Sequence, residues 1–556
     1  MLDNHLTLVY LVYRIIKTLT MVLTSSRLTL IATLFIVLCA NVLFWSTFTP
    51  KLDLSSIKGW STLIALALLM IWILATILLP LGFKYLLKPL IILFLFISAV
   101  VSYFQNEMGV VINEAMVQSL FETNTKEATE FLSIKYFIYL IILGAIPSYI
   151  IYKLPIKYYG FWRDWGYRLL TWLVLTAVTI IVVWFSYKDI ALIFRENQDL
   201  RPKLNPYYAI NSTIKYFYNT ANAAPENPEI IAEDATLTTP QKAKKTVVLF
   251  VLGETARRDH FSLAGYERQT NPELSNIPDV VFFKDVWSCG TATAESLPCI
   301  YSHLGQTNFS VRKAWQYQNV LDVLKRTGIT NYWRDNNTGC KGICKRINNE
   351  DADTLAKTYP NFCTDGECYD EILLQGLTDK IQQSTGDVLF VLHQKGSHGP
   401  AYYQRYPQAF ARFTPECKDN APQNCERETI INAYDNTILY TDYVLKQAIA
   451  YLKQHEAEFN SVLVYVSDHG ESLGENGIYL HGLPYMIAPD AQKQVPMLLW
   501  FSQGYRSSFP SKMSCAQTKV NERLSHDNVF HTLLGLFEVK TNLYHPELDI
   551  STCSNH

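Results

Sequence analysis

Net charge is nearly absent from this chain, and no stretch of clustered basic residues occurs in it. Its 556 residues carry 48 Lys and Arg against 50 Asp and Glu, and only 18% of all residues are charged. The sequence also has no internal repeat and no low-complexity tract. Because nucleic-acid binding depends on a basic surface that neutralises phosphates, the composition argues against a nucleic-acid partner.

Cysteine is almost missing from the first half of the chain. Of 11 cysteines, only Cys39 precedes residue 288. The others fall into close pairs with two left over: Cys289 and Cys299, Cys340 and Cys344, Cys363 and Cys368, Cys417 and Cys425, then Cys515 and Cys553. Disulfides persist in oxidising compartments, so we predict short-loop bridges in an exported domain. A structural zinc site is the alternative, but only Cys340 and Cys344 have a suitable spacing.

Apolar residues, 49% of the chain, crowd into its first third. Five segments there are long and apolar enough to cross a bilayer, at about Leu28–Phe48, Ser61–Leu81, Leu86–Phe104, Tyr136–Ile151 and Leu169–Phe185. A spanning helix needs about 20 such residues, so the last two segments are short. A buried helical core is the alternative, and five apolar segments in succession disfavour it. No small-residue cleavage site follows the first segment, which we interpret as a retained anchor.

Lys and Arg in the short loops predict the orientation of these segments, since both residues resist translocation. The residues before the first segment, the second loop and the fourth loop are basic, which places them inside. The third loop, Gln105–Ser133, holds five Glu against Lys126 alone and belongs outside. Five crossings then leave everything after about Tyr187 outside the cytoplasm.

The sequence predicts four regions. Residues 1–27 form a cytoplasmic segment, 28–188 a transmembrane domain of five helices, 189–245 an interfacial helix with a linker, and 246–556 a soluble domain. Asp189–Tyr218 mixes charges with tyrosines, which suits a helix at headgroup depth. Three prolines among Glu, Ala and Thr make Ala221–Lys245 an exposed linker.

Two unbroken apolar runs in the soluble part end in potential metal ligands. Val462–Val466 leads into Ser467-Asp468-His469-Gly470-Glu471, and Val247–Leu252 leads into Gly253-Glu254. Such runs are typical of strands covered on both faces in an α/β sheet, whose ligands gather at the carboxyl ends. Further runs at Val388–Leu392 and Pro496–Phe501, with a helical pattern at Ile430–Leu452, favour a doubly wound sheet.

Carboxylate and imidazole ligands together suit Zn²⁺, and the following glycine allows a tight turn of the backbone. Glu254, Asp468 and His469 therefore form a candidate zinc site. The alternatives are that Glu254 and Asp468 cap helices and that His469 lies at the surface. The convergence of two strand ends favours the metal.

The segment Ser288–Cys299 adds hydroxyl groups, on a loop that two cysteines could tie. A hydroxyl directed at zinc and at a helix N-terminus would lose its proton more easily and become a nucleophile. Thr291, Thr293 and Ser296 all qualify, and capping hydroxyls are the alternative. The residues alone leave the choice open.

Several motifs occur in an order that resembles one enzyme family. They are Gly253-Glu254-Thr255-Ala256-Arg257, Ser288-Cys289-Gly290-Thr291-Ala292-Thr293, Trp333-Arg334-Asp335-Asn336-Asn337, Gly396-Ser397-His398-Gly399-Pro400, Asn432-Ala433-Tyr434-Asp435-Asn436 and Ser467-Asp468-His469-Gly470-Glu471-Ser472. This set is similar to the lipid A phosphoethanolamine transferases, including the mobile colistin-resistance enzymes. The resemblance covers all but about the first twenty residues.

The resemblance implies an α-helical five-span transmembrane domain followed by an α/β periplasmic domain of the alkaline-phosphatase and sulfatase type. It implies zinc bound by four residues, Glu254, Thr293, Asp468 and His469. It also selects Thr293 as the nucleophile. The nucleophile loops of sulfatases, built on Cys or Ser followed by Pro and Arg, are absent from the sequence.

Further positions match family residues that contact the donor or assist catalysis. They are Ser119, Thr123, Glu127, Thr338, Lys341, His398 and His481. Lys341 and the two histidines are suitable charge partners for a transferring phosphoryl group. Taken one by one, each is more often a surface lysine or an ordinary histidine. Ser119 stands where the family usually has Asn, and a carboxylate at Glu127 suits an ammonium group.

The implied reaction is a two-step transfer in the bacterial inner membrane. Thr293 takes phosphoethanolamine from phosphatidylethanolamine and passes it to lipid A, which confers polymyxin and colistin resistance. The expected protein is a zinc-dependent monomer. Alternatives are a same-fold enzyme with another acceptor, such as a core sugar or a glycerol-phosphate polymer, a hydrolase, and a membrane sensor with a structural metal. A sensor would have little use for a hydroxyl loop beside the metal.

Overall fold

A computed structural model describes residues 23–122, 129–221, 225, 227–238, 244–364 and 367–553, in two compact units. The first comprises the residues up to Glu114 together with Phe131–Lys215. The second comprises Ala115–Glu130 together with the residues from Tyr216 onward. A short segment from the apolar third of the sequence therefore belongs to the second unit.

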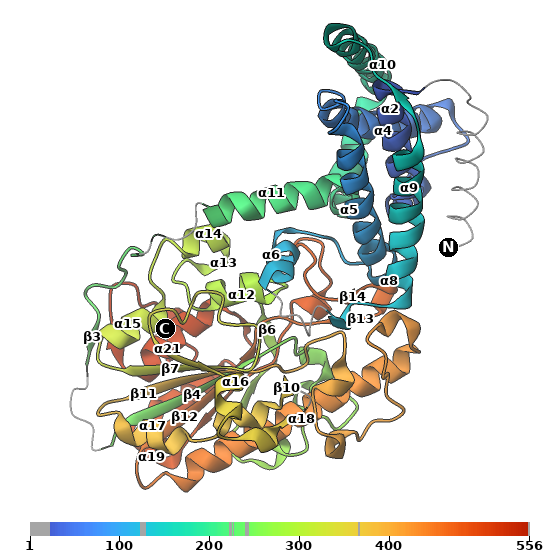
Figure 1. Cartoon of the computed structure of the whole chain (residues 1–556). Helices are drawn as coiled ribbons and strands as arrows, with labels where there is room; N and C mark the ends of the chain where they lie inside the picture. The colour runs from blue at the N-terminus through green and yellow to red at the C-terminus, as the bar shows by residue number, and fades with distance from the viewer. Residues whose placement is uncertain are drawn as a thin grey trace. The chain divides into compact units, whose positions relative to one another are not determined.

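The first unit is helical (Figure 1). Its elements are α2 (Ser25–Cys39), α3 (Val42–Phe48), α4 (Ile57–Leu78), α5 (Leu87–Met108), α8 (Ile134–Tyr139), a π-helical turn η2 (Leu140–Ala145), α9 (Ile146–Lys153), α10 (Phe161–Glu196) and the paired strands β1 (Leu23–Thr24) and β2 (Ile156–Lys157). Four described helices are long and apolar enough to cross a membrane: Ile57–Leu78, Leu87–Met108, Ile134–Lys153 and Phe161–Glu196. The bent pair Ser25–Cys39 and Val42–Lys51 could add a fifth span. Ile134–Lys153 and Phe161–Glu196 extend past both ends of the apolar segments seen in the sequence, because backbone hydrogen bonding continues through the flanking residues.

The first apolar segment is bent rather than straight. A single helix was expected over Leu28–Phe48, whereas the two helices differ in direction by 62°. At the bend, the Asn41 amide donates to the carbonyls of Ile36 and Asn205, over 3.0 and 2.8 Å. Asn205 in turn donates to Ala40 O at 2.8 Å and to Ser98 O at 2.9 Å. Buried polar groups need partners, so this network stabilises the bend.

The connector also differs from the expected helix over Asp189–Tyr218. Helix α10 continues to Glu196, a 3₁₀ segment covers Gln198–Lys203, and α11 runs over Tyr207–Ala221. Pro206 separates the last two, since a proline disfavours the helical conformation of the residue before it.

A seven-stranded sheet forms the centre of the second unit (Figure 1). Its order is β5 (Val281–Phe283), β15 (Met497–Phe501), β12 (Asn460–Ser467), β4 (Thr246–Gly253), β11 (Val388–His393), β7 (Thr330–Asp335) and β8 (Asn348–Asp351). All neighbours pair in parallel except β15, which is antiparallel to β12 and β5. The runs expected to be strands are strands, and the one at Pro496–Phe501 reverses direction.

Helices cover both faces of this sheet. Residues of α12 (Thr293–Ile300), α15 (Val320–Arg326) and α21 (Asp527–Leu536) share one hydrophobic core, and residues of α16 (Ala352–Ala356), α17 (Leu377–Gln383) and α18 (Arg427–Gln454) share the other. The remaining elements of the unit are α6 (Glu114–Glu122), α13 (Gly305–Asn308), α14 (Val311–Ala314), α19 (Gln503–Ser508), α20 (Pro510–Thr518), and the short strands β3 (Thr236–Leu237), β6 (Asp285–Trp287), β9 (Cys363–Thr364), β10 (Glu367–Cys368), β13 (Ser472–Leu473), β14 (Tyr479–Leu480), β16 (Arg523–Ser525) and β17 (Val539–Lys540). The β4 and β12 strands are buried along their whole length, as unbroken apolar runs require.

Five disulfides tie the loops of the second unit. They are Cys289–Cys299, Cys340–Cys344, Cys363–Cys368, Cys417–Cys425 and Cys515–Cys553. The pairs follow the spacing seen in the sequence, and the two cysteines left over, 38 residues apart, pair with each other. Cys39 remains a buried free thiol.

Candidate metal centre and nucleophile

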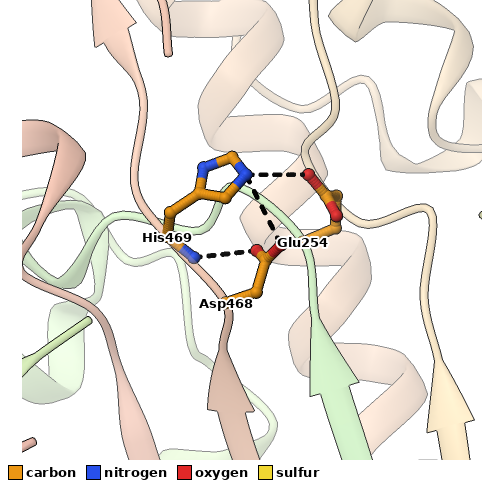
Figure 2. A group of neighbouring side chains, drawn as sticks. All are labelled: Glu254, Asp468 and His469. Carbon is orange, nitrogen blue, oxygen red and sulfur yellow. Dashed lines mark hydrogen bonds and ion pairs between the residues drawn. The ribbon is translucent and has the colours of Figure 1, made fainter. Parts of the chain in front are cut away.

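Two adjacent parallel strands bring three buried ligands to one edge of the sheet. Ser467 at the end of β12 pairs with Gly253 at the end of β4, so the residues that follow them emerge side by side. Figure 2 shows that Glu254, Asp468 and His469 point toward one another. His469 Nε2 lies 3.3 Å from Glu254 Oε1 and 3.4 Å from Asp468 Oδ2. All three side chains are completely buried.

Thr293 brings its hydroxyl into the same cluster. The Thr293 hydroxyl donates to Glu254 Oε2 over 3.0 Å, and its oxygen lies 3.3 Å from His469 Nε2. Thr293 is the first residue of α12, and the Cys289–Cys299 disulfide ties the loop before this helix to the end of the helix. Among the three candidate hydroxyls, Thr291 instead donates to the Leu483 carbonyl. The geometry therefore brings Thr293, and not Thr291, to the ligand cluster.

Electrostatics at this cluster favour a bound cation. Burial, and then the charge of Glu254, raise the pKa of Asp468. Burial by itself would also raise the pKa of Glu254, but the hydrogen bond and charge of His469 lower it well below its ordinary value. Two carboxylates buried this close repel each other, and a divalent cation would relieve the repulsion.

The donor atoms fit a metal ion. One ligand atom from each of Glu254, Asp468 and His469 lies within 4.8 Å of the others, and Asp468 Oδ2 is buried without a hydrogen-bond partner. Two carboxylates and one imidazole are ligands that divalent zinc accepts. Neither carboxylate caps a following α-helix, because Glu254 leads into a short 3₁₀ turn and Asp468 into a loop. The capping alternative is thereby excluded.

The glycine after His469 has a different role from the one expected. A Cβ atom on Gly470 would lie 2.0 Å from the Ala491 carbonyl oxygen, so no side chain fits there. The Gly470 amide donates to the Gln492 carbonyl at 3.0 Å. Glycine is required here because two backbone segments approach closely, which the sequence pattern does not reveal.

Three residues without an assigned role in the sequence surround Glu254. The Asn337 amide donates to Glu254 Oε2 over 2.6 Å. His393 Nε2 lies 3.9 Å from the same oxygen, and its Nδ1 lies 2.9 Å from Asp335 Oδ2. Burial by itself would raise the pKa of Asp335, but His393 overrides it and lowers the pKa to about 2. His393 ends strand β11, so the strand-end argument that found Glu254 could have found it.

A buried histidine links the nucleophile loop to strand β12, and no sequence signal points to it. His526 Nδ1 accepts from the Cys289 amide over 3.2 Å, and Nε2 lies 2.9 Å from the Ser467 carbonyl, to which it donates. Burial lowers the pKa of His526 to about 4. The neutral ring thus joins the loop before Thr293 to the residue before Asp468.

Two predicted catalytic histidines lie beside the cluster. The His481 ring lies 4.3 Å from the His469 ring and 5.7 Å from the His398 ring, centroid to centroid. His481 Nδ1 lies 3.0 Å from the buried carboxylate of Glu471. Burial lowers the pKa of His398 well below its ordinary value, so its imidazole is neutral.

The other predicted residues lie in or near the segment Ala115–Glu130. The Lys341 ammonium lies 2.9 Å from Glu122 Oε2 and donates to the Thr338 carbonyl over 3.0 Å. Thr338 follows Asn337, and the Asn337 amide donates to Glu254. Thr338 and Lys341 are thereby connected to the candidate metal ligands. Ser119 lies on α6, while Thr123 and Glu127 lie outside the described residues.

Comparison with known proteins identifies relatives along nearly the whole chain. Residues 69–221 match the family described as phosphoethanolamine transferase EptA/EptB, and residues 246–539 match the sulfatase family. Over 533 residues the chain is 38% identical to phosphoethanolamine transferase EptA of Salmonella typhimurium, covering 94% of this chain and 95% of that protein. It is 37% identical over 519 residues to phosphatidylethanolamine transferase Mcr-1 of Escherichia coli, covering 91% and 93%.

A solved structure supports the same relationship. The integral membrane protein lipooligosaccharide phosphoethanolamine transferase A (EptA) from Neisseria meningitidis aligns with a TM-score of 0.88 at 32% identity. The alignment covers 96% of this chain and 99% of that chain. The similarity therefore includes the helical apolar region as well as the sulfatase-like unit.

Proposed function

Because the chain belongs to the phosphoethanolamine transferase family, we propose that it moves phosphoethanolamine from phosphatidylethanolamine to a phosphate of lipid A. The observation that carries this proposal is the Thr293 hydroxyl, 3.0 Å from Glu254 and 3.3 Å from His469 at the start of a helix. A hydroxyl so placed is a nucleophile beside a cation site. Mcr-1 is named for the proposed donor and the Neisseria protein for an acceptor glycolipid.

The metal of this proposal is zinc, held by Glu254, Thr293, Asp468 and His469. Bound there, zinc would lower the pKa of the nucleophilic hydroxyl and neutralise charge that develops on the phosphoryl oxygens. Asn337 and His393 orient the Glu254 carboxylate, as the outer partners of metal ligands do.

In the first step the Thr293 oxygen attacks the phosphorus of phosphatidylethanolamine. A Thr–phosphorus bond forms, the bond from phosphorus to the glycerol oxygen breaks, and diacylglycerol leaves with a proton. His398 and His481 carry that proton from the hydroxyl to the leaving oxygen, since one is neutral and the other is oriented by Glu471. The Lys341 ammonium pairs with the phosphoryl charge.

In the second step a phosphate oxygen of lipid A attacks the same phosphorus. The bond from phosphorus to the Thr293 oxygen breaks, and that oxygen takes up the proton that the monoprotonated lipid A phosphate loses as it attacks. The product carries an ammonium group that offsets negative charge on the outer leaflet. Cationic peptides such as polymyxins then bind less strongly, which confers colistin resistance.

The donor headgroup lies against the segment Ala115–Glu130 in this proposal. Ser119, Thr123 and Glu127 hold its ethanolamine end, and Thr338 with Lys341 holds its phosphate. The position of Ser119 on α6, whose last residue Glu122 pairs with Lys341, supports the first assignment.

The chain acts as a monomer in the bacterial inner membrane, with five spans in residues 28–188 and a catalytic domain, 246–556, in the periplasm. Four long apolar helices and one bent pair support five spans. The disulfides support an oxidising compartment.

Mass spectrometry of lipid A from cells that produce the full chain tests the proposal. We expect lipid A that carries phosphoethanolamine with the native chain, none with Thr293→Ala, and a reduced amount with Thr293→Ser, which keeps a hydroxyl. Unmodified lipid A beside native protein that releases diacylglycerol would rule out the acceptor. Modification by Thr293→Ala would rule out the nucleophile.

A further inference from the structure

A large cavity in the second unit extends beyond the residues assigned to the donor. Its volume is about 780 Å³, within the range of roughly 300–1,000 Å³ found for small-molecule sites. One wall consists of Thr338 and Lys341, and the other walls carry Trp315, Tyr317, Lys345 and Arg346. None of the latter four takes part in the chemistry described above. The cavity therefore has room for a group larger than phosphoethanolamine.

The cavity adjoins the reacting centre. Thr338 follows Asn337, whose amide donates to Glu254, and Glu254 accepts from the Thr293 hydroxyl. Pro298, which also lines the cavity, lies five residues after Thr293 on α12, about 7.5 Å along the helix axis. The cavity lining is therefore linked to the Glu254–Thr293 pair through Asn337.

The charges around the cavity favour an anion. Glu122 is the only acidic residue among its described lining residues, and it is paired with Lys341 at 2.9 Å. Arg346 is paired with Asp322, which lies outside the lining. Lys345 is exposed and forms no ion pair with any residue that the structure describes. A ligand phosphate can thus gain a charged partner without breaking an existing pair.

A hydrogen-bond donor and aromatic rings line the cavity together with Lys345. A Cβ atom on Gly342 would lie 3.9 Å from both Lys345 Cε and Trp315 Nε1. The lysine stem and the indole N–H therefore both lie near this glycine. The indole N–H of Trp315 donates to no residue within the described part of the chain. Trp315 and Tyr317 are half-buried, and both line the cavity. Aromatic faces of this kind pack against the C–H faces of sugar rings.

We propose that this cavity binds the phosphorylated sugar end of the acceptor, with Lys345 and Trp315 holding a phosphate and Tyr317 packing against a sugar ring. This inference rests on the proposed function, because that function supplies a phosphorylated glycolipid as the acceptor. Beyond Thr338 and Lys341, which hold the donor phosphate in the proposed function, the donor headgroup is the less suitable occupant, because its ammonium would lie against Lys345 and Arg346. The acceptor carries phosphate without an ammonium and gains from the same charges.

Equilibrium binding to the full-length Thr293→Ala protein in detergent tests the inference without turnover. The probes are an acyl-free glucosamine disaccharide bisphosphate for the acceptor and glycerophosphoethanolamine for the donor, each titrated by calorimetry. We expect Lys345→Glu and Trp315→Ala each to weaken disaccharide binding by about tenfold, the loss of one charge-assisted contact, with glycerophosphoethanolamine binding unchanged. Lys357→Glu, an exposed lysine outside the lining, is the matched control and should change neither affinity.

Three results would overturn the inference. The first is that the disaccharide does not bind at millimolar concentration. The second is that both variants bind the disaccharide with an affinity within twofold of the parent's. The third is that only the affinity for glycerophosphoethanolamine falls, which would make the cavity a donor site. A failure of the proposed function would give a different result, in which the native protein binds the disaccharide but leaves lipid A unmodified in cells. With native Thr293, the KM for lipid A should rise about tenfold in Lys345→Glu while diacylglycerol release stays unchanged.

Discussion

Glu254, which follows strand β4, is held by His393 at the end of strand β11 and by Asn337 in the loop after strand β7. The Asn337 amide lies 2.6 Å from one carboxylate oxygen, and His393 lies 3.9 Å from the same oxygen while bonded to Asp335. A carboxylate held in this way would lose little freedom on binding a metal ion. Asn337 and His393 therefore act through Glu254 and not on the substrate.

Removal of the Asn337 amide should weaken metal binding. We expect Asn337→Ala to lower zinc affinity by about 10- to 100-fold, the usual effect of losing an outer partner of a metal ligand. Competitive titration with a zinc chelator measures the affinity, and added zinc should restore transfer. Asn276→Ala is the control, because that exposed amide donates only to the Pro272 carbonyl. Unchanged zinc affinity in Asn337→Ala would contradict the positioning role.

His526 should make the second unit sensitive to acid. Its folded pKa is about 4 against an ordinary value of 6.5, because burial disfavours the charged ring. Between these values the unfolded chain binds a proton that the folded chain does not, so stability falls as the pH drops from 6.5 to 4. Through this group, the free energy of unfolding is lower by about 3 kcal/mol below pH 4 than above pH 6.5.

Replacement of His526 should remove that part of the pH dependence. In His526→Gln the melting temperature at neutral pH should fall, and its further decrease between pH 6.5 and 4.5 should be smaller than in the parent. Thermal unfolding of the full chain in detergent measures both. The control is His545→Gln, since His545 has a side chain 55% exposed. Parallel pH profiles for His526→Gln and the parent would refute the assignment.

At the scale of elements, the described residues of Ala115–Glu130 include two glutamates that form ion pairs with the sulfatase-like core. Glu122 pairs with Lys341, and Glu130 pairs with Arg405 at 2.7 Å. Arg405 is almost completely buried and also donates to the His398 carbonyl over 2.7 Å. The segment that contributes Ser119 thus shares contacts with two of the proposed catalytic residues.

Truncation of Arg405 should lower the free energy of unfolding of the protein. Arg405→Ala leaves Glu130 and Glu367 without their partner, and breaking a buried pair costs about 3–5 kcal/mol. Glu130→Gln should cost less, because burial already raises the pKa of Glu130 despite the charge of Arg405. Denaturant unfolding of the full chain gives these values. Arg506→Ala, which breaks an exposed pair with Asp279, should cost under about 1 kcal/mol.

The Arg405 variants also test whether the pair positions His398. We expect the first step, measured as diacylglycerol release, to lose kcat in Arg405→Lys with little change in KM, because the lysine keeps the charge but not the bond to the His398 carbonyl. An equal loss in Arg506→Lys would show that the effect is not specific to His398.

At the scale of the whole molecule, the candidate metal ligands and the residues proposed to hold the ethanolamine end of the donor come from different parts of the chain. All three side chains of the ligand cluster, and Thr293, come from residues 246–556. The segment Ala115–Glu130 comes from the region between two apolar helices, yet it belongs to the second unit. A chain that begins at Tyr216 would keep the first group of residues and lose the second.

Such a truncated chain should bind zinc with an affinity within about threefold of the full protein, since no ligand or outer partner is lost. It should unfold at a lower temperature, because Arg405 loses Glu130, and it should not modify lipid A. Zinc titration, thermal unfolding and mass spectrometry measure the three effects. A large fall in zinc affinity would show that the segment supports the metal site, contrary to this expectation.

Much of the site could be predicted from the sequence because its ligands follow buried strands. Unbroken apolar runs indicated β4 and β12, and parallel pairing brought their carboxyl ends together. The bend at Asn41 and the reversed direction of β15 were not predictable in this way. Each depends on hydrogen bonds between residues distant in the sequence or on the order in which strands pair.

The sequence by itself determined the apolar helices, the four short-range cysteine pairs and the candidate ligands Glu254, Asp468 and His469, because each is encoded by residues close together or at the end of a recognisable strand. Only the tertiary structure decided which side chains support them. Arg405 meets Glu130 across 275 residues, and His526 meets Cys289 across 237. Contacts over such separations leave no local pattern, because their geometry is set by packing of the whole unit and not by neighbouring residues.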